Sequence, residues 1–194
     1  MLDLKSSMCF YIIMSNMQSI EIEIRSFLTQ LQYKNLLKRF KMVVDIGEKD
    51  YQETYYFDKD GDFRISLENK LAKLWCKKGK IHESSREEIE VIIDRDQFEK
   101  LKKMVTEFLG YDVMVSWIRE RYKFEWKGIK VCLDYTKDYG YILELEKMVN
   151  KRDKESVLQE LRKRLKELGI TETSKEVFDR KYKEYIKNWK EKLG

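Results

Sequence analysis

The sequence lacks proline altogether and contains few of the residues that usually build zinc or redox sites. His82 is its single histidine, so zinc sites and catalytic triads that need a histidine base have at most one candidate. Its three cysteines, Cys9, Cys76 and Cys132, provide neither an even disulfide framework nor a metal-ligand spacing. We therefore expect free thiols in a reducing compartment, which predicts a cytoplasmic protein.

The sequence also has no long hydrophobic run and no long block of one charge. The apolar run from Met8 to Met14 is too short to span a bilayer, and only Lys5 precedes it as the basic residue that a signal peptide would need. The net charge of +5 arises from interspersed acidic and basic residues. The composition therefore predicts neither a membrane nor a nucleic-acid partner.

Two acidic stretches with strict alternation dominate what is present. In residues 20–25 the side chains of Glu21, Glu23 and Arg25 share one face of a predicted strand, and three isoleucines share the other. Residues 142–146 repeat this arrangement with two further glutamates. Two such strands could supply four carboxylates to one site.

Other alternating stretches carry basic side chains on one face. They contribute Arg64, the pair Arg119 and Arg121, and Arg86 together with Glu88 and Glu90. If these strands close into a barrel with charges inward and apolar faces outward, the interior becomes a polar tunnel. Buried ions are costly unless they are paired or neutralised, so such a lining suits a polyanion chelated to a divalent metal. A metal–triphosphate complex has this charge pattern.

The stretch EIEIR at residues 21–25 resembles the ExExK/R signature of the CYTH, or triphosphate tunnel metalloenzyme, superfamily. Further segments resemble the other motifs of this superfamily in their usual order: 51–58, 62–65, 72–77, 86–90, 119–121, 131–134 and 139–146. A lone ExExR is weak, because alternating Glu and Ile are common on solvated strands. The ordered set of motifs is specific to this superfamily, which includes class IV adenylate cyclases and proteins similar to thiamine triphosphatase.

The resemblance implies an α+β fold built on a closed, antiparallel, eight-stranded β-barrel with a charged interior, the triphosphate tunnel, covered by helices. We expect residues 1–19 to form an N-terminal extension, with Met14 or Met17 as the true start and Met17 favoured because it comes just before the EIEIR strand. Residues 20–149 would form the tunnel domain. Residues 150–194 would form C-terminal helices that pack on the barrel.

The resemblance also implies the site. The metal, Mg²⁺ or Mn²⁺, would be held by Glu21, Glu23, Asp134, Glu144 and Glu146. Substrate phosphates would be bound by Arg25, Arg64, Lys77, Arg86, Arg119 and Arg121. The catalytic set would be Glu21, Glu23, Arg25, Glu144 and Glu146, and Glu88 and Glu90 would orient the cations or add a metal ligand.

The implied activity is hydrolysis of the terminal phosphate of a triphosphate, either tripolyphosphate, thiamine triphosphate or ATP. A class IV adenylate cyclase, which makes cyclic AMP and pyrophosphate from ATP, is the alternative within the superfamily. A non-catalytic module that binds polyphosphate or nucleotide is the alternative of another class. Ser66 stands where the superfamily has a second arginine, so substrate choice can differ. The protein is expected to be a monomer or a homodimer.

Helices are predicted between and after the strands. Residues 28–43 and 96–109 have apolar residues at helical spacing, and the second places Phe98, Leu101, Val105 and Phe108 on one stripe. Residues 153–168 form a third helix that Gly169 would end. A fourth, rich in aromatic residues, would begin with a capping box of Thr173 and Glu176.

Overall fold

The structure is a computed structural model that describes residues 19–58, 62–78 and 85–193. The expected N-terminal extension lies almost entirely outside these residues, as do Cys9 and His82. Within the described part of the chain, no helix is long and apolar enough to cross a membrane.

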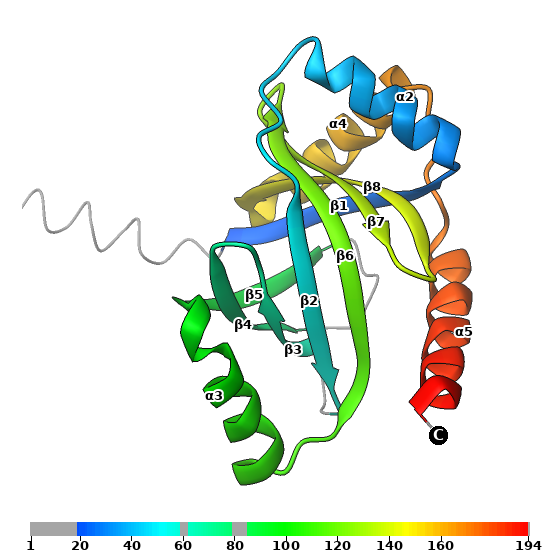
Figure 1. Ribbon diagram of the computed structural model, residues 1–194. Coiled ribbons are helices and arrows are strands. Elements are labelled where there is room, and N and C mark those ends of the chain that lie inside the picture. Colours follow the sequence, from blue (N-terminus) through cyan, green and yellow to red (C-terminus); the bar gives the residue numbers. More distant parts are fainter. Residues whose placement is uncertain (1–18, 59–61, 79–84, 194) are drawn as a thin grey trace, which may run out of the picture.

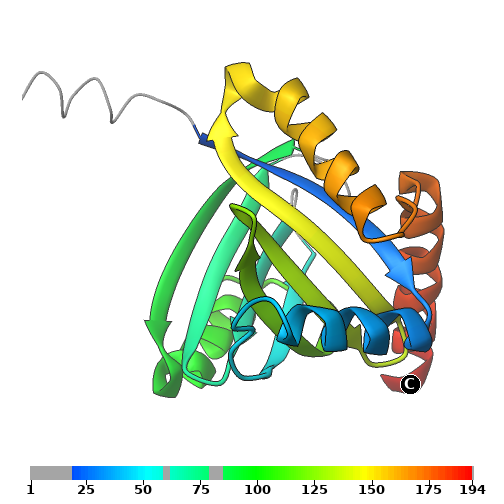
Figure 2. The same ribbon diagram turned by 90° about the horizontal axis from the view of Figure 1, so that it is seen from above.

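One antiparallel sheet of eight strands forms the centre of the molecule (Figures 1 and 2). The strands are β1 (Ser19–Leu28), β2 (Asp50–Phe57), β3 (Asp62–Leu67), β4 (Leu71–Lys78), β5 (Ser85–Asp94), β6 (Val113–Trp126), β7 (Ile129–Thr136) and β8 (Gly140–Asn150). Their order in the sheet is β1-β5-β4-β3-β2-β6-β7-β8, and β8 pairs again with β1. The predicted eight antiparallel strands in a mixed α and β fold are therefore confirmed.

The two neighbours of β1 hold it very differently. Strand β8 pairs with β1 along its whole length, from Ser19 opposite Asn150 to Leu28 opposite Tyr141. Among the described residues, β5 meets β1 through two residue pairs, Glu21 with Arg86 and its neighbour Ile22 with Ser85, the first described residue after the gap at 79–84. The closure that the sequence predicts for the barrel depends on this β1–β5 seam.

Helices cover the outside of the sheet. They are α2 (Gln30–Lys41), α3 (Phe98–Lys103), α4 (Lys154–Glu167) and α5 (Lys175–Leu193), with short turns η1 (Arg95–Gln97), η2 (Met104–Phe108) and η3 (Lys151–Asp153). Helices α2 and α4 pack on β1 and β8, α5 packs on β6, and α3 packs on β3 (Figures 1 and 2). The β1–β8 side is therefore the most thoroughly covered part of the sheet.

The main apolar core lies between the sheet and these helices, outside the sheet instead of within it. Ile22 and Ile24 of β1 and Leu143 and Leu145 of β8 are buried against α2 and α4, including Leu161. Because neighbouring side chains of a strand point to opposite faces, burying these residues outward turns the alternate charged residues inward. The period-two pattern of the sequence therefore places the charges inside the curved sheet.

The helix ends follow local rules in two cases and depart from them in one. Thr29 and Gln32 form a capping box at the start of α2, and Gly169, with φ +74°, ends α4 as predicted. The capping box predicted at Thr173 is wrong. The Thr173 hydroxyl accepts a hydrogen bond from the backbone N–H of Phe27 at 3.0 Å, and α5 begins at Lys175. Pairing with β1 takes the hydroxyl that the helix would have used.

The apolar stripe predicted for the helix at residues 96–109 is confirmed at its start and is wrong at its end. Phe98 and Val105 are buried, whereas Phe108 is 79% exposed. The last turn, η2, is a π-helix in which the Leu109 N–H bonds to the Met104 carbonyl. A π-turn holds more residues than an α-turn, so Phe108 rotates away from the sheet. Gly110, at φ +69°, follows the helix as predicted.

Candidate functional site

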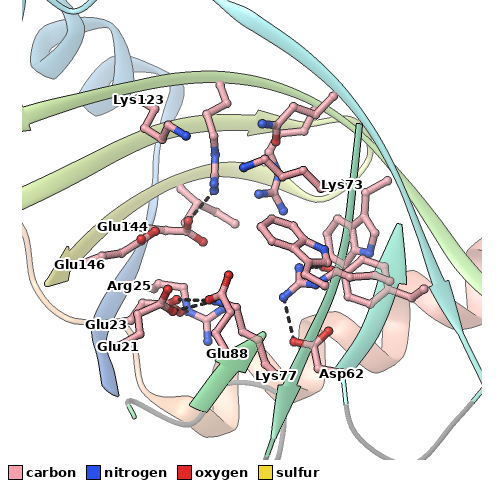
Figure 3. Close-up of a pocket in the computed structure, with 18 of the residues that line it drawn as sticks. Glu21, Glu23, Arg25, Asp62, Lys73, Lys77, Glu88, Lys123, Glu144 and Glu146 are labelled. Atoms are coloured by element: carbon pink, nitrogen blue, oxygen red, sulfur yellow. Dashed lines mark hydrogen bonds and ion pairs between the residues drawn. The ribbon is translucent and has the colours of Figure 1, made fainter. Parts of the chain in front are cut away.

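The inner face of the sheet encloses one polar cavity, called here the central cavity. Including its open mouths it measures about 920 Å³. Glutamates from β1 and β8 lie near one another on one side, and Lys73 lies across the cavity from Glu21 and Glu23 (Figure 3). The charged residues that line it are Glu21, Glu23, Arg25, Asp62, Arg64, Glu68, Lys73, Lys77, Glu88, Glu90, Arg119, Arg121, Lys123, Lys130, Glu144 and Glu146.

The acidic side of the cavity is built by cross-strand pairing of β1 and β8. Glu23 lies directly opposite Glu146, and Arg25 lies opposite Glu144. All three glutamates of these pairs are buried. Like charges placed directly opposite on neighbouring strands are destabilising, and more so when buried. The Glu23–Glu146 pair is therefore stable only if positive charges lie close to it.

Lys77 of β4 is one such cation. Its Nζ lies 2.6 Å from Glu21 Oε1, 3.0 Å from Glu88 Oε2 and 3.8 Å from Glu23 Oε2. Burial disfavours its charge, but the three carboxylates outweigh burial and raise the pKa of Lys77. Burial likewise opposes ionisation of Glu88, and Lys77 outweighs it, so the pKa of Glu88 is lowered. One buried lysine is therefore shared by three carboxylates, which outnumber it.

Arg121 of β6 is the second internal cation. Its Nε donates to Asp134 Oδ1 at 2.7 Å, and its Nη2 donates to both Asp134 and Glu144. Arg119 reaches the same Asp134 carboxylate at 3.5 Å. Burial alone would raise the pKa of Glu144, but Arg121, Arg119 and Arg25 outweigh it and hold this pKa below its ordinary value. Glu144 is therefore ionised at neutral pH.

Glu146 is in a different electrostatic state. It forms an ion pair with Lys130, whose side chain is half exposed, and it accepts a weak hydrogen bond from Cys132 Sγ at 3.6 Å. Burial, with the repulsion of Glu144 and Glu23, outweighs Lys130 and raises the pKa of Glu146 to about 7. Ligand atoms of Cys132, Glu144 and Glu146 all lie within 4.8 Å of one another. These three residues form the densest group of potential metal ligands in the described part of the chain.

The cationic side combines Arg64 of β3 with Lys73 of β4. Arg64 Nη2 pairs with Asp62 at 2.8 Å, its Nη1 donates to the Tyr56 hydroxyl at 2.5 Å, and the guanidinium lies over the Trp75 ring at 4.6 Å. Lys73 Nζ lies 3.1 Å from Glu90. Each cation is thus held by side chains of its own strand or of an adjacent strand, and each lines the cavity.

Arg25 connects the acidic side to an aromatic end of the cavity. Its Nε lies 2.9 Å from Glu23, and its guanidinium lies 5.1 Å from the centre of the Phe178 ring of α5. Trp117 of β6 stacks on Tyr185 of α5 at 4.5 Å and meets Tyr139 edge-on. The aromatic stripe of α5 therefore packs on the sheet and forms the wall of one end of the cavity.

The structure brings most of the predicted site residues together. Glu21, Glu23, Arg25, Arg64, Lys77, Arg119, Arg121, Glu144 and Glu146 all line the central cavity, as do Glu88 and Glu90. Asp134 is fully buried in the wall behind Arg121. The backbone of Arg86 pairs with Glu21, but its side chain lies outside the described residues. Ser66 is buried, and its hydroxyl has no hydrogen-bond partner among the described residues.

Several residues at the site were missed by sequence reasoning. They are Asp62, Glu68, Lys73, Lys123, Lys130 and Cys132. Each lies an even number of positions from a predicted residue on the same strand or its extension, as Cys132 does from Asp134. Period-two spacing alone would have placed them on the inner face. The motifs did not single them out, and cysteine spacing along the chain gave no sign of Cys132, because its neighbours lie on another strand.

Comparison with known proteins agrees with this geometry. The family model of the CYTH domain matches residues 19–177. Comparison with curated proteins finds no match. A protein from Pyrococcus horikoshii OT3 is similar in structure at 25% identity and a TM-score of 0.64, covering 78% of this chain and 92% of its own.

Two further solved structures share the fold. A putative adenylyl cyclase from Hippeastrum, described as having a dominant triphosphatase activity, matches with 20% identity and a TM-score of 0.59, over 84% of this chain and 95% of its own. A putative adenylate cyclase from Vibrio parahaemolyticus matches with 12% identity and a TM-score of 0.63, over 80% and 94%. With a family model that spans most of its length and a cavity of both charges inside an eight-stranded sheet, the chain belongs to the CYTH family.

Proposed function

We propose that this protein is a metal-dependent enzyme that hydrolyses the terminal phosphate of an inorganic or organic triphosphate held in the central cavity. The observation that carries the proposal is the lining of that cavity, in which buried carboxylates of β1 and β8 face buried cations of β3, β4 and β6. Carboxylates suit a hard divalent ion, and cations suit the phosphate oxygens. A metal–triphosphate complex matches both halves.

The residues of the acidic side fit a divalent cation. Glu23 and Glu146 are a buried like-charge pair, and Glu144 and Glu146 place carboxylate oxygens close together. We propose Glu21, Glu23, Glu144 and Glu146 as ligands of Mg²⁺ or Mn²⁺, with Asp134 in support through Arg121. A bound ion of this kind supplies Lewis acidity that polarises the phosphoryl group and the attacking water. The proton of that water passes to a carboxylate of the acidic side.

The cations orient the substrate. Arg64, Lys73 and Arg121 each hold a carboxylate in the structure and still face the cavity. We propose that these groups, with Arg25, Lys77, Arg86 and Arg119, donate to phosphate oxygens and offset the charge that develops on phosphoryl transfer. Arginine forks can bind two oxygens at once, which fixes the chain of phosphates along the cavity.

The same proposal includes the shape of the site. Residues 20–149 form the tunnel domain, and the sheet closes as a barrel along the β1–β5 seam. Residues 150–194 supply the outer helices, of which α4 supports the acidic side and α5 walls the aromatic end. Most of the lining charges are buried, among them Glu144 and Arg121, and this supports an enclosed site, because water would otherwise screen the interaction of both walls with phosphate.

A class IV adenylate cyclase activity is the second candidate. The observation that favours it is the aromatic end of the cavity, where Tyr56, Trp117 and Phe178 lie beside Arg25 and Arg64. Flat aromatic side chains next to cations are suited to a nucleobase attached to a triphosphate.

The test is to incubate purified protein with Mg²⁺ or Mn²⁺ and, separately, with tripolyphosphate, thiamine triphosphate and ATP, and to follow products by phosphorus NMR. Release of orthophosphate supports the triphosphatase and names its substrate. Cyclic AMP with pyrophosphate supports the cyclase instead. Tight metal-dependent binding with no turnover of any of the three would contradict both and leave a binding module.

A further inference from the structure

We infer that the aromatic end of the central cavity binds the terminal phosphate of the triphosphate, and that the Trp117 indole N–H and the Tyr139 hydroxyl donate hydrogen bonds to its oxygens. The inference rests on the proposed function, because it gives a direction to a triphosphate already placed in this cavity. It adds two uncharged donors to the proposed cations, and neither residue was among the predicted site residues. In this direction, the organic group of an organic triphosphate points to the opposite end of the cavity.

The two donors are buried and unpaired. Trp117 is 5% exposed, Tyr139 is 8% exposed, and both side chains line the central cavity. Neither Trp117 Nε1 nor the Tyr139 hydroxyl has a hydrogen-bond partner among the described residues. A buried donor without an acceptor is costly, because it has given up its hydrogen bond to water and gained no other. Two such donors at one end of a cavity therefore point to a ligand rich in acceptor atoms.

Packing holds the two donors side by side. The ring of Tyr139, in the turn between β7 and β8, meets the ring of Trp117 edge-on with the centres 4.5 Å apart. Phe27 of β1 meets Tyr139 edge-on at 5.3 Å, and Tyr185 of α5 stacks on Trp117 at 4.5 Å. This stacking occupies a face of the indole that a flat nucleobase could otherwise use. The packing therefore favours a ligand that contacts the polar edges of the two rings.

The charge at this end favours an anion. Arg25 lies there, and Arg119 comes two residues after Trp117 on the inward face of β6. The Arg119 Nε also has no hydrogen-bond partner among the residues that the structure describes. Burial raises the pKa of Tyr139 and outweighs the opposing effect of Arg25 and Arg119, so the hydroxyl keeps its proton at neutral pH and can donate it to a hydrogen bond. Two cations beside two neutral donors suit the oxygens of a phosphate.

The opposite end of the cavity opens onto a second hollow. Lys123 lines both the central cavity and this hollow, which lies between residues 47–50 and 69–71 and measures about 970 Å³ with its open mouth. Figure 3 shows Lys123 and Arg25 well apart within the site. Because α5 walls the aromatic end, an organic group fits at the Lys123 end, and this leaves the terminal phosphate at the Arg25 end.

The experiment removes each donor but keeps an aromatic ring, with Tyr139→Phe and Trp117→Phe in the full chain. Calorimetry in Mn²⁺ measures the binding of tripolyphosphate and of β,γ-imido-ATP, an ATP analogue that resists hydrolysis. Each variant should bind both ligands about ten- to a hundredfold more weakly, as expected for the loss of one hydrogen bond to a charged group. Tyr139→Phe should not lower the free energy of unfolding in urea, because the hydroxyl that it removes is unpaired in the free protein.

Tyr185→Phe is the matched control for Tyr139→Phe. The Tyr185 hydroxyl donates to the Ser116 carbonyl at 3.0 Å, and Tyr185 lies outside the lining of the central cavity. Its removal should lower the free energy of unfolding and leave the binding of both ligands unchanged. A purely structural role of Tyr139 would give this same pattern in Tyr139→Phe, so the two variants together separate ligand binding from stability.

The outcomes separate this inference from the proposed function. Equal weakening of both ligands supports the inference, because the terminal phosphate is the group that they share at this end. Weaker binding of β,γ-imido-ATP alone would mean that the aromatic end takes the nucleobase, and the inference would be wrong. If both variants bind both ligands as wild type does, the inference is wrong and hydrolysis by the wild-type protein still supports the proposed function. If the wild-type protein neither binds nor hydrolyses any triphosphate, both are wrong. Tyr139→Phe decides the question even if Trp117→Phe does not fold.

Discussion

The two sides of the central cavity differ in how they are supported from outside. The β1–β8 side is backed by α2 and α4, and its outward residues Ile22 and Leu143 are fully buried. On the β4–β5 side, the outward face of β5 carries Ile89, which is 65% exposed. Within the described part of the chain, β1 is paired along its length to β8 and through two residue pairs to β5.

This difference matches the two tasks proposed for the cavity. Metal ligands must be held in fixed positions, and the acidic side has the packing to hold them. Phosphate-binding cations on long side chains can adjust to their ligand, so their strands need less support. We therefore expect the acidic side to be rigid and the β4–β5 side to move more readily.

The largest expected effect is on the acidic side. Replacing Glu144→Gln together with Glu146→Gln should reduce kcat for the hydrolysed triphosphate by about a thousandfold or more, because the divalent ion loses two charged ligands. Steady-state orthophosphate release in Mn²⁺ measures this. Glu184→Gln, on the exposed face of α5, is the matched control and should behave as wild type. Wild-type turnover in the double variant would show that these two residues are not needed for catalysis, which would contradict their proposed role as metal ligands.

The support of the acidic side should show in stability. Leu161→Ala in α4 removes a fully buried side chain behind β1 and β8, and should lower the free energy of unfolding by roughly 2–5 kcal/mol. Ile89→Ala on the exposed face of β5 should change it by less than about 0.5 kcal/mol. Urea denaturation followed by circular dichroism compares the two. Equal losses would mean that the two sides are equally well packed.

The cationic side should respond in affinity more than in rate. Arg64→Met removes a guanidinium that faces the cavity, and should lower kcat/KM by about ten- to a hundredfold, the value of one charge-assisted hydrogen bond to phosphate. Most of the loss should appear in KM. Arg64→Lys keeps the charge without the fork and should fall between wild type and Arg64→Met. An unchanged KM in both variants would show that Arg64 does not bind the substrate phosphates.

The raised pKa of Glu146 predicts a pH dependence of stability in the metal-free protein. The folded state keeps the proton up to about pH 7, whereas the unfolded state loses it near the ordinary pKa of 4.5. Between these values the folded state binds more protons, so stability falls as pH rises, by at most about 1.4 kcal/mol per pH unit.

Urea unfolding at several pH values measures this term as the difference between wild type and Glu146→Gln, which cannot titrate. Relative to the variant, wild type should lose stability steadily between pH 4.5 and 7. A constant difference across that window would mean that Glu146 has an ordinary pKa in the folded protein. The exposed Glu184→Gln variant should run parallel to wild type.

The smallest effect should be in local dynamics. Backbone amides of β5 near Ser85 are expected to exchange hydrogen faster than those of β8 opposite β1, because two residue pairs join β1 to β5 in the described ranges, whereas β8 pairs with β1 along its whole length. Hydrogen-exchange mass spectrometry measures this. Adding Mn²⁺ with tripolyphosphate should slow exchange at the seam more than at β8. Uniform protection of both neighbours of β1 would show that the two sides are equally rigid.

Much of the architecture could be read from the sequence. Alternation in residues 20–25 and 142–146 identified two strands and the side chains on each face, since side-chain direction in a strand is a local property of the backbone. The order of the motifs then indicated the eight strands and most of the charged lining. Gly169 and Gly110 marked helix ends because a positive φ is available to glycine at little cost.

What the tertiary structure decided is which of these side chains meet. Cys132 lies beside Glu144 and Glu146 because β7 pairs with β8 in one register. This register depends on both strands together and cannot be read from the sequence of either strand alone. Thr173 bonds to Phe27 instead of capping its own helix, because packing of the chain after α4 along β1 brings that backbone N–H to it. The sequence by itself determined faces and elements; register and packing, which depend on contacts far apart in the chain, determined the site.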